Sequence, residues 1–327
     1  MTFAAGEIQR CAAALGFRAD SLEKALRLLS LLEALRSHPF LRPRVALKGG
    51  TALNLFLFEL PRLSVDIDIN YIGTRDGEAM LTERPKLEEA IHAVCSRERL
   101  TVRRVPGEHA GGKWRLSYTN AAGSSGTLEL DVNFMLRVPL WPITLMDSRS
   151  LGLASAKQIP ILDQHELAGG KLAALCARNA SRDVFDAREL LQHKRVALDR
   201  AKLRLAFLIY GGMNRKDWRK VRIEDIGIEA TEVERHLVPM LRADIAPNKR
   251  AIKSWTSKLV RECRDLMSVV LPLSEKEREF IESLNVRGEV LAELLTPDSA
   301  LQNVIREHPG LKWKALNVRK RGESGQT

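Results

Sequence analysis

Cysteine is scarce in this chain: the 327 residues include only Cys11, Cys95, Cys176 and Cys263. They lie far apart and show neither a CxxC pair nor the Cys/His spacing of a metal site. The sequence therefore offers no disulfide framework and no cysteine-held zinc site. It predicts reduced, mostly buried thiols in a reducing compartment.

Long apolar runs are also missing, and we expect no secretory signal. No window contains the roughly 18 uncharged apolar residues that a membrane-spanning helix needs. Residues 1–17 lack the basic start and long apolar core of a secretory signal. Apolar residues make up 45% of the chain and charged residues 28%, which is typical of a globular protein. We expect a cytoplasmic monomer without membrane contact.

Acidic residues are fewer than basic ones, 41 against 52, which gives a net charge of +11. This excess favours a polyanionic partner such as nucleic acid, although solubility alone is the alternative. Ten Lys or Arg residues lie between 194 and 222 against two aspartates, and five more lie between 312 and 321. Beside a nucleotide site these runs would guide an RNA backbone; otherwise they are solvated helix faces. Trp218 and Trp313 lie within these runs and Trp255 lies between them; each would either stack on bases or pack in the core.

The spacing of apolar residues changes near residue 155. Before it, helical stretches alternate with strand-like stretches, and after it nearly every stretch has helical spacing. We therefore predict an α+β protein, with a mixed or antiparallel sheet in a domain over 1–155 and a mainly helical domain over 156–310. The basic, then polar, end at 311–327 is expected to be a flexible tail.

A glycine turn joins one predicted strand to a helix. The segment "RVALKGG" is a short strand that ends at Gly49 and Gly50, and "TALNLFLFEL" fits a helix that Thr51 caps and Pro61 terminates. Such a turn presents free backbone N–H groups, which suit a triphosphate. It is not a Walker P-loop, because no G-x₄-G-K-[ST] is present and Lys48 precedes the glycines.

Two aspartates follow within a strand. In "SVDIDINY" the apolar residues alternate with polar ones, so Asp66 and Asp68 project from one face beside each other. Carboxylates so close repel each other, and a divalent cation removes the repulsion; Mg²⁺ takes one or two carboxylates together with phosphate and water oxygens. The alternative is a solvated strand face that carries two acids.

A second acidic strand repeats this pattern. "TLELDVNF" places Glu129, Asp131 and Asn133 on one face. If this strand pairs beside the first, Asp131 completes a cluster of three carboxylates, whereas a shift of the register by one pleat pair would bring in Glu129 instead. Two ions held there would activate an attacking oxygen and stabilise a leaving pyrophosphate.

These features resemble a known fold and, more specifically, a known family. Gly-Gly before a helix, a strand with DxD and a later acidic strand resemble the nucleotidyltransferase fold of the DNA polymerase β type. The fuller string resembles the AbiEii/AbiGii-type toxin nucleotidyltransferases, whose first motif is GGTAL followed by R-x-S-x-D-[IL]-D. The matching residues are Gly49, Gly50, Thr51, Ala52, Leu53, Arg62, Ser64, Asp66, Ile67 and Asp68. The second motif, K-L-x-A-L followed by R-D-x-x-D, matches Lys171, Leu172, Ala174, Leu175, Arg182, Asp183 and Asp186, with Arg178 between the two parts.

The resemblance implies roles for individual residues. Catalysis would depend on Asp66, Asp68, Lys171 and Asp186. The metal, Mg²⁺ or Mn²⁺, would be bound by Asp66, Asp68 and Asp131. The NTP substrate would be held by Gly49, Gly50, Thr51, Ser64, Lys171, Arg178 and Arg182.

Some of these roles have plainer alternatives. Lys171 would otherwise be a surface lysine on an Ala-rich helix. Asp183 fits the first turn of a helix capped by Ser181, where an acid is favoured in any case. Arg178 and Arg182 would either bind phosphate or pair with the two aspartates of the second motif.

The activity implied by the resemblance is that of a Mg²⁺-dependent toxin in a toxin–antitoxin, abortive-infection system. It would add a nucleotide to RNA, with a tRNA 3′ end as the leading acceptor, and an antitoxin would be encoded nearby. A small-molecule nucleotidyltransferase of the aminoglycoside type is the first alternative, although a cationic acceptor would favour an acidic cleft. A non-catalytic RNA-binding protein is the second, and the retained Asp66 and Asp68 count against it.

Overall fold

The computed structural model describes residues 3–105, 107, 110–193 and 196–324. The chain forms two compact units. Unit 1 consists of residues 1–137, 142–162 and 234–248, and unit 2 of residues 138–141, 163–233 and 249–327.

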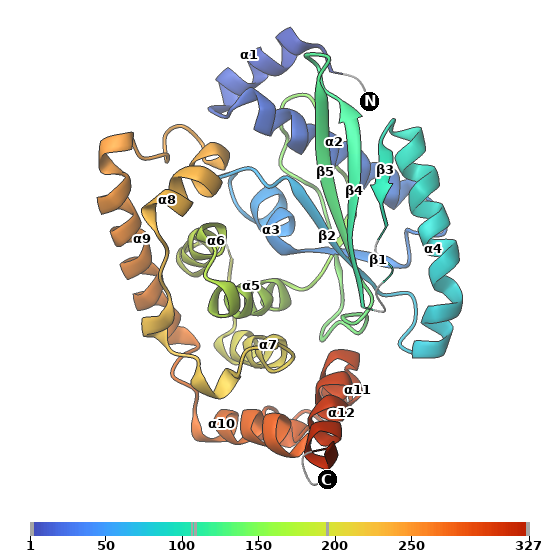
Figure 1. Cartoon of the computed structure of the whole chain (residues 1–327), viewed down its shortest axis with the longest axis vertical. Coiled ribbons are helices and arrows are strands. Elements are labelled where there is room, and N and C mark those ends of the chain that lie inside the picture. Colours follow the sequence, from blue (N-terminus) through green and yellow to red (C-terminus); the bar gives the residue numbers. More distant parts are fainter. Residues whose placement is uncertain (1–2, 106, 108–109, 194–195, 325–327) are drawn as a thin grey trace. The chain divides into compact units, whose positions relative to one another are not determined.

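Unit 1 is built on a seven-stranded sheet with the order β3-β4-β5-β2-β1-β7-β6 (Figure 1). Its strands are β1 Val45–Lys48, β2 Asp66–Tyr71, β3 Thr101–Arg104, β4 Gly111–Thr119, β5 Ser125–Asn133, β6 Thr144–Met146 and β7 Ile159–Ile161. The pairs β2–β5 and β1–β7 are parallel and the other pairs are antiparallel. The predicted mixed sheet within an α+β protein is thereby confirmed.

Two long helices cover one face of this sheet. The helices of unit 1 are α1 Ala5–Leu15, α2 Ala19–Ser37, α3 Gly49–Ala52, the π-helical turn η1 Leu53–Leu57, and α4 Gly77–Arg97. On β4, the Trp114 ring lies 5.2 Å from His92 of α4, and the Arg27 guanidinium of α2 lies 4.2 Å from the Tyr118 ring. Because residues two apart on a strand share a face, α2 and α4 pack on the same side of the sheet. Lys113 and Arg115, on either side of Trp114, point to the opposite side, together with Asp131 and Glu129, which are in register with them.

The helix after the glycine turn differs from the prediction at both ends. It begins at Gly49 with Lys48 as the N-cap, so Thr51 does not cap it. It continues as a π-helical turn and ends at Leu57, several residues before Pro61. Thr51 lies inside the helix because its hydroxyl bonds to the neighbouring strand, as described below.

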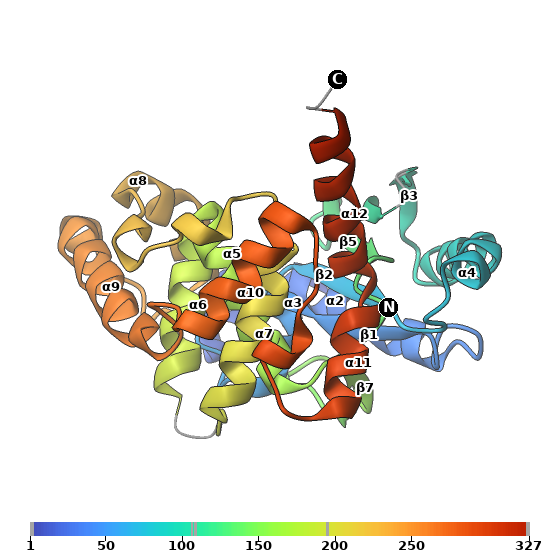
Figure 2. The same cartoon turned by 90° about the horizontal axis from the view of Figure 1, so that it is seen from below.

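Unit 2 is helical, as the periodicity predicts (Figure 2). Its α-helices are α5 Gln164–Arg178, α6 Ser181–Gln192, α7 Arg200–Gly212, α8 Ala230–Glu232, α9 Ile252–Leu266, α10 Glu275–Glu282, α11 Ser299–Glu307 and α12 Pro309–Ser324. Helix α5 packs against both α6 and α7, and α9 packs against α6. Short 3₁₀ and π turns lie between the helices of the second half of the chain: η2 Trp218–Lys220, η3 Ile223–Asp225, η4 Val233–Leu237, η5 Val238–Met240, η6 Lys249–Ala251, η7 Met267–Val269, η8 Ser283–Arg287 and η9 Ala292–Leu294.

The limits of the two units and the structure of the C-terminal end differ in detail from the domain division expected from the sequence. The main run of unit 1 ends at residue 162, near the expected boundary at 155, but unit 1 also includes residues 234–248. The sequence did not predict that residues 234–248 would belong to the same unit as the sheet. Residues 311–324 of the expected flexible tail lie in helix α12, and residues 325–327 lie outside the described part.

The thiols and the hydropathy agree with the sequence analysis. All four cysteines are free, and burial raises the pKa of Cys95, Cys176 and Cys263 to about 12. No helix within the described residues is long and apolar enough to cross a membrane.

A buried carboxylate anchors the short segment 138–141 within unit 2. Glu166, on the first turn of α5, accepts hydrogen bonds from the backbone N–H groups of Leu140 and Trp141 and from the Tyr210 hydroxyl at 2.9–3.3 Å. Burial raises the pKa of Glu166 to about 7, against the lowering effect of these donors.

This carboxylate makes stability depend on pH. Between its ordinary pKa of 4.5 and about 7 the folded chain keeps the Glu166 proton while the unfolded chain loses it. The Glu166 contribution should therefore fall by about 3 kcal/mol as the pH rises through this window, and then stay constant. Denaturant unfolding of wild type and Glu166→Gln at pH 4.5–8 tests this. The free energy of unfolding of the variant should lack the decrease that Glu166 causes between pH 4.5 and about 7. Identical pH profiles of the two proteins would contradict the raised pKa of Glu166.

Candidate active site

The glycine turn lies directly against the first acidic strand. Gly49 has φ +74°, and a Cβ added there would lie 2.2 Å from the Oδ2 atom of Asp68. Glycine is therefore required twice, for the backbone conformation and for the close approach. The absence of a side chain lets the Asp68 carboxylate rest against the start of helix α3.

Thr51 connects the same turn to the start of β2. It is fully buried, and its hydroxyl donates to the Asp66 carbonyl oxygen and shares a hydrogen bond of 2.9 Å with the Ser64 hydroxyl. Both side chains thus position the strand on which the two aspartates lie. The predicted part of Thr51 in phosphate binding would accordingly depend on its backbone N–H.

The strand register brings four carboxylates onto one face. In the parallel pairing of β2 with β5, Asp66 is opposite Glu129 and Asp68 is opposite Asp131. Asp131 is therefore the neighbour of Asp68, as the unshifted register predicts. Burial raises the pKa of Asp131. The negative charges of Asp68 and Glu129 raise this pKa further, and the positive charges of Lys48 and Lys113 oppose the increase.

Lysines flank these carboxylates on both sides. Lys48 on β1 is opposite Asp68, and Lys113 on β4 is opposite Asp131. The Lys113 Nζ lies 2.7 Å from a Glu129 oxygen, so Glu129 is already engaged in an ion pair. Sequence reasoning did not assign Lys113, although its place in the alternating segment "KWRLSYT" could have indicated a strand beside the acidic one.

The carboxylates suit a metal that completes its shell from elsewhere. Within the described ranges, no three His, Cys, Asp or Glu side chains converge closely enough to enclose a cation. Mg²⁺ is commonly bound by one or two carboxylates together with water and substrate phosphates. Asp68 and Asp131, in register on adjacent strands with Asp66 two residues away, provide this kind of donor set.

The second predicted motif forms a buried ion cluster in unit 2. The Lys171 Nζ on α5 lies 2.9 Å from Asp183 Oδ1 and 2.9 Å from Asp186 Oδ2, both on α6. The side chains of these three residues are 7%, 1% and 0% exposed. The alternative in which Lys171 is a surface lysine is therefore wrong.

Arg178 completes this cluster from the surface. Its guanidinium, 64% exposed, makes a bidentate contact with Asp183. Burial acts to raise the pKa of Asp183, but the charges of Lys171 and Arg178 outweigh it and hold the pKa below its usual value. Of the two open roles for Arg178, the structure shows the pairing with Asp183. Arg182, on the next helix, is half-buried.

Ser181 is not the cap of helix α6. The N-cap is Ala180, and the Ser181 hydroxyl and backbone N–H both bind the carboxylate of Glu232. Asp183 does lie in the first turn, as predicted, but its carboxylate is directed to Lys171 and Arg178.

Part of the basic run 194–222 is engaged within unit 2. Arg204 pairs with Glu277, and Arg219 pairs with Asp217. The first two residues of the run, 194 and 195, lie outside the described part. The Arg204 side chain is only 17% exposed, so its pair is not part of a solvated helix face, whereas Arg219, 40% exposed, lies at the surface.

The three tryptophans near the basic runs have different environments. Trp218 is buried with its ring 5.4 Å from that of Phe207, so it packs in the core. Trp255 stacks on Phe185 at 6.5 Å. Trp313 on α12 is 47% exposed, so of the two alternatives core packing does not apply to it.

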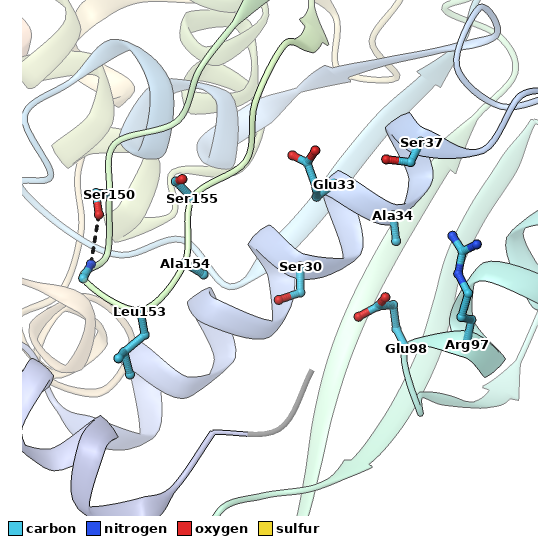
Figure 3. A pocket seen from close by; sticks show the side chains of 11 residues that line it. Ser30, Glu33, Ala34, Ser37, Arg97, Glu98, Ser150, Leu153, Ala154 and Ser155 are labelled. Atoms are coloured by element: carbon cyan, nitrogen blue, oxygen red, sulfur yellow. Dashed lines mark hydrogen bonds between the residues drawn. The ribbon is translucent and has the colours of Figure 1, made fainter.

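A pocket of unit 1 lies away from the predicted site residues. It has a volume of about 620 Å³ and is lined by side chains of α2 and of the end of α4, together with residues 150–155 (Figure 3). Figure 3 shows Ser30 and Glu33 of α2 along its floor, with Arg97 and Glu98 on one side. Because α2 and α4 cover the opposite face of the sheet, this pocket takes no part in the carboxylate site.

The fold and the paired acidic strands beside a glycine turn define a nucleotidyltransferase. Residues 30–281 match the family described as nucleotidyl transferase AbiEii toxin of type IV toxin–antitoxin systems, and the chain belongs to this family. Its structure is similar to that of MenT4, a nucleotidyltransferase toxin from Mycobacterium tuberculosis H37Rv, with a TM-score of 0.60 and 17% identity. That similarity covers 93% of this chain and 99% of MenT4. None of the curated proteins matches the chain significantly.

A substitution in the glycine turn tests its contact with Asp68. Gly49→Ala should lower nucleotide transfer at least about 100-fold, because the new methyl group displaces the Asp68 carboxylate. Gly123→Ala is the matched control, since Gly123 also has a positive φ of +81° but open space around it. The transfer rate should fall in Gly49→Ala but not in Gly123→Ala, whereas the melting temperatures of both variants should fall by similar amounts. Equal activities would contradict the role of the contact.

Proposed function

We propose that this toxin transfers a nucleotide from an NTP to RNA, with a tRNA 3′ end as the acceptor. The observation that supports this most strongly is the register that places Asp68 beside Asp131, with Gly49 against Asp68. We further propose that it acts in the cytoplasm as a monomer. The type IV family implies an antitoxin partner.

The reaction is a substitution at phosphorus. An acceptor hydroxyl oxygen forms a bond to the α-phosphorus, the bond to the β-phosphate oxygen breaks, and pyrophosphate leaves while the hydroxyl proton passes to solvent. Asp66, Asp68 and Asp131 would hold Mg²⁺, or Mn²⁺ in its place. When bound, this cation neutralises charge on the phosphates and activates the attacking oxygen.

The remaining candidate residues bind and orient the NTP. The backbone N–H groups of Gly49, Gly50 and Thr51 would donate hydrogen bonds to phosphate oxygens at the start of the helix. Ser64 keeps the turn attached to β2 through Thr51.

The second motif is proposed to supply positive charge. Lys171 would attract the triphosphate as a point charge. Asp186, bound to its Nζ, would fix the position of the ammonium group. Arg178 and Arg182 would add charge for the phosphates.

Charge on the carboxylate face favours RNA over a cationic small molecule. Strands β3 and β4 carry four basic and no acidic residues. An aminoglycoside would be repelled by these side chains, whereas an RNA backbone would be attracted. Membership in a nucleotidyltransferase family counts against a non-catalytic protein.

The experiment uses purified protein, Mg²⁺ and each α-labelled NTP in turn, with total tRNA or an aminoglycoside as the acceptor. Label should enter tRNA with at least one NTP and should require the divalent cation. Label in the aminoglycoside alone would overturn the proposed acceptor. Label in the protein alone would identify a protein acceptor instead.

A further inference from the structure

Exposed cations on β3 and β4 form a strip on the same sheet face as the carboxylates. This basic strip consists of Arg103, Arg104, Lys113 and Arg115. On β4, Lys113 is opposite Asp131 and Arg115 is opposite Glu129, so both share the carboxylate face. The strip continues onto β3, where Arg104 is opposite Arg115. Arg103 joins this face through a β-bulge, and its Nε donates to the Ser117 hydroxyl at 2.8 Å.

The strip retains positive charge that its local partners do not neutralise. Lys113 and Arg115 lie 2.7 and 3.9 Å from oxygens of the same carboxylate, that of Glu129. Their side chains are 58% and 65% exposed. The bond from Arg103 goes to a neutral hydroxyl. Lys113 and Arg115 thus pair with one carboxylate, and Asp66 and Asp131 attract Lys113 in addition. The three arginines of the strip are exposed, so the strip can accept further negative charge from solution.

Packing does not account for these cations. The other face of β4 is formed by Trp114, Leu116 and Tyr118, which are buried and carry the hydrophobic contacts. Charged residues on an edge strand hinder aggregation, which would explain the arginines of β3. Strand β4 is an interior strand of the sheet, so Lys113 and Arg115 require another reason.

The order of the strands shows where the strip lies relative to the glycine turn and the carboxylates. The glycine turn follows β1, the carboxylates lie on β2 and β5, and the strip lies on β4 and β3. Neighbouring strands are about 5 Å apart, so the strip begins about 5 Å from the strand of Asp131 and about 10 Å from that of Asp68. In phosphoryl transfer the attacking and leaving oxygens lie roughly in line. If the triphosphate occupies the β1 side, the acceptor approaches from the side of the basic strip.

We propose that the basic strip binds the phosphate backbone of the last nucleotides of the acceptor RNA and thereby places its terminal hydroxyl beside Asp131. This inference rests on the proposed function, because it assumes RNA as the acceptor. It assigns RNA binding in unit 1 to residues that neither family motif contains.

The test replaces three arginines and measures binding separately from chemistry. The variant Arg103→Ala, Arg104→Ala, Arg115→Ala keeps Lys113 on Glu129. The control Lys24→Ala, Lys86→Ala, Arg97→Ala removes the same charge from α2 and α4, on the opposite face. Steady-state labelling of tRNA gives kcat, KM for tRNA and KM for NTP, and fluorescence anisotropy with labelled tRNA without NTP gives Kd.

The strip variant should raise both KM and Kd for tRNA at least about tenfold, with kcat and KM for NTP changed less than about twofold. The salt dependence of log Kd should become shallower by about 2, from about 0.7 for each of three lost phosphate contacts. The control should remain within about threefold of wild type. The corresponding triple Arg→Lys variant, which keeps the charge, should also stay near wild type.

Other outcomes overturn the assignment. Unchanged tRNA affinity in the strip variant would contradict RNA binding by the basic strip. Equal losses of tRNA affinity in the strip and control variants would contradict it as well. A fall in kcat alone would show that the arginines act on the carboxylates. Unchanged tRNA affinity with loss of neutralisation by the antitoxin would make the strip a protein-binding surface. Failure of wild type to label any RNA would instead overturn the proposed function.

Discussion

Replacing Asp68 by asparagine should lower nucleotide transfer by about 1,000-fold or more, which corresponds to about 4 kcal/mol of transition-state stabilisation. The amide keeps the shape of the side chain but removes the negative charge that would bind the cation. Asp68 is central because it lies against Gly49, is opposite Lys48 of β1 and lies beside Asp131 of β5. Single-turnover transfer to tRNA at saturating NTP measures the effect, and expression in cells should no longer arrest growth.

Substitutions of two neighbouring acids test whether the loss of activity is specific to the proposed metal ligands. Asp131→Asn should cause a loss of similar order, since Asp131 is next to Asp68 in the register. Glu129→Gln should change kcat less than about tenfold, because Glu129 is engaged with Lys113. A fully active Asp68→Asn variant would remove the metal-site assignment, and a larger loss in Glu129→Gln than in Asp131→Asn would reverse the choice between the two acids.

Replacing Lys171 by methionine should destabilise the protein by about 3–5 kcal/mol and also abolish efficient NTP use. The substitution leaves Asp183 and Asp186 buried without the ammonium group that lies 2.9 Å from both. From the sequence alone, loss of this side chain would weaken NTP use and leave the fold intact. Burial of the cluster changes that expectation. Denaturant unfolding measures the stability, and the dependence of rate on NTP concentration measures substrate use.

A charge-free cluster separates these two effects. The triple variant Lys171→Met, Asp183→Asn, Asp186→Asn removes all three buried charges, while Arg178 stays at the exposed surface. It should recover most of the lost stability but remain inactive. Recovery of activity together with stability would show that Lys171 acts only in folding. A stable Lys171→Met variant would contradict the ionic role of the cluster.

Local patterns were sufficient to predict the acidic strands and their faces. Alternation of apolar and polar residues placed Asp66 and Asp68 on one face, and the same rule placed Glu129 and Asp131 together. Which of the latter lies beside Asp68 depends on how β5 pairs with β2. Register is a property of two distant segments, so the sequence left the choice open between them.

Helix boundaries and capping were harder to predict where a side chain has a tertiary partner. Thr51 is a good N-cap by type, yet its hydroxyl bonds to Asp66 and Ser64, and the helix starts at Gly49. Ser181 likewise binds Glu232 in place of capping α6. In both cases a hydrogen bond to a residue distant in the sequence replaces the local one.

Burial of charged residues was also not evident from local sequence. An Ala-rich helix gave no sign that Lys171 would be enclosed, because the enclosing aspartates come from the next helix. Lys113 belongs to a strand without an acid of its own and acquires its partner Glu129 only through the pairing of β4 with β5. Charged pairs between elements are visible only once the packing is known.

The most direct measurement is the intact mass of each tRNA recovered from cells that express the toxin or its Asp68→Asn variant. Nucleotide addition predicts that at least one tRNA from toxin-expressing cells gains the mass of one or more nucleotide residues at its 3′ end, and that the variant leaves all masses unchanged. Unmodified tRNA in growth-arrested cells, or tRNA that has lost mass, would contradict the proposed transfer to RNA.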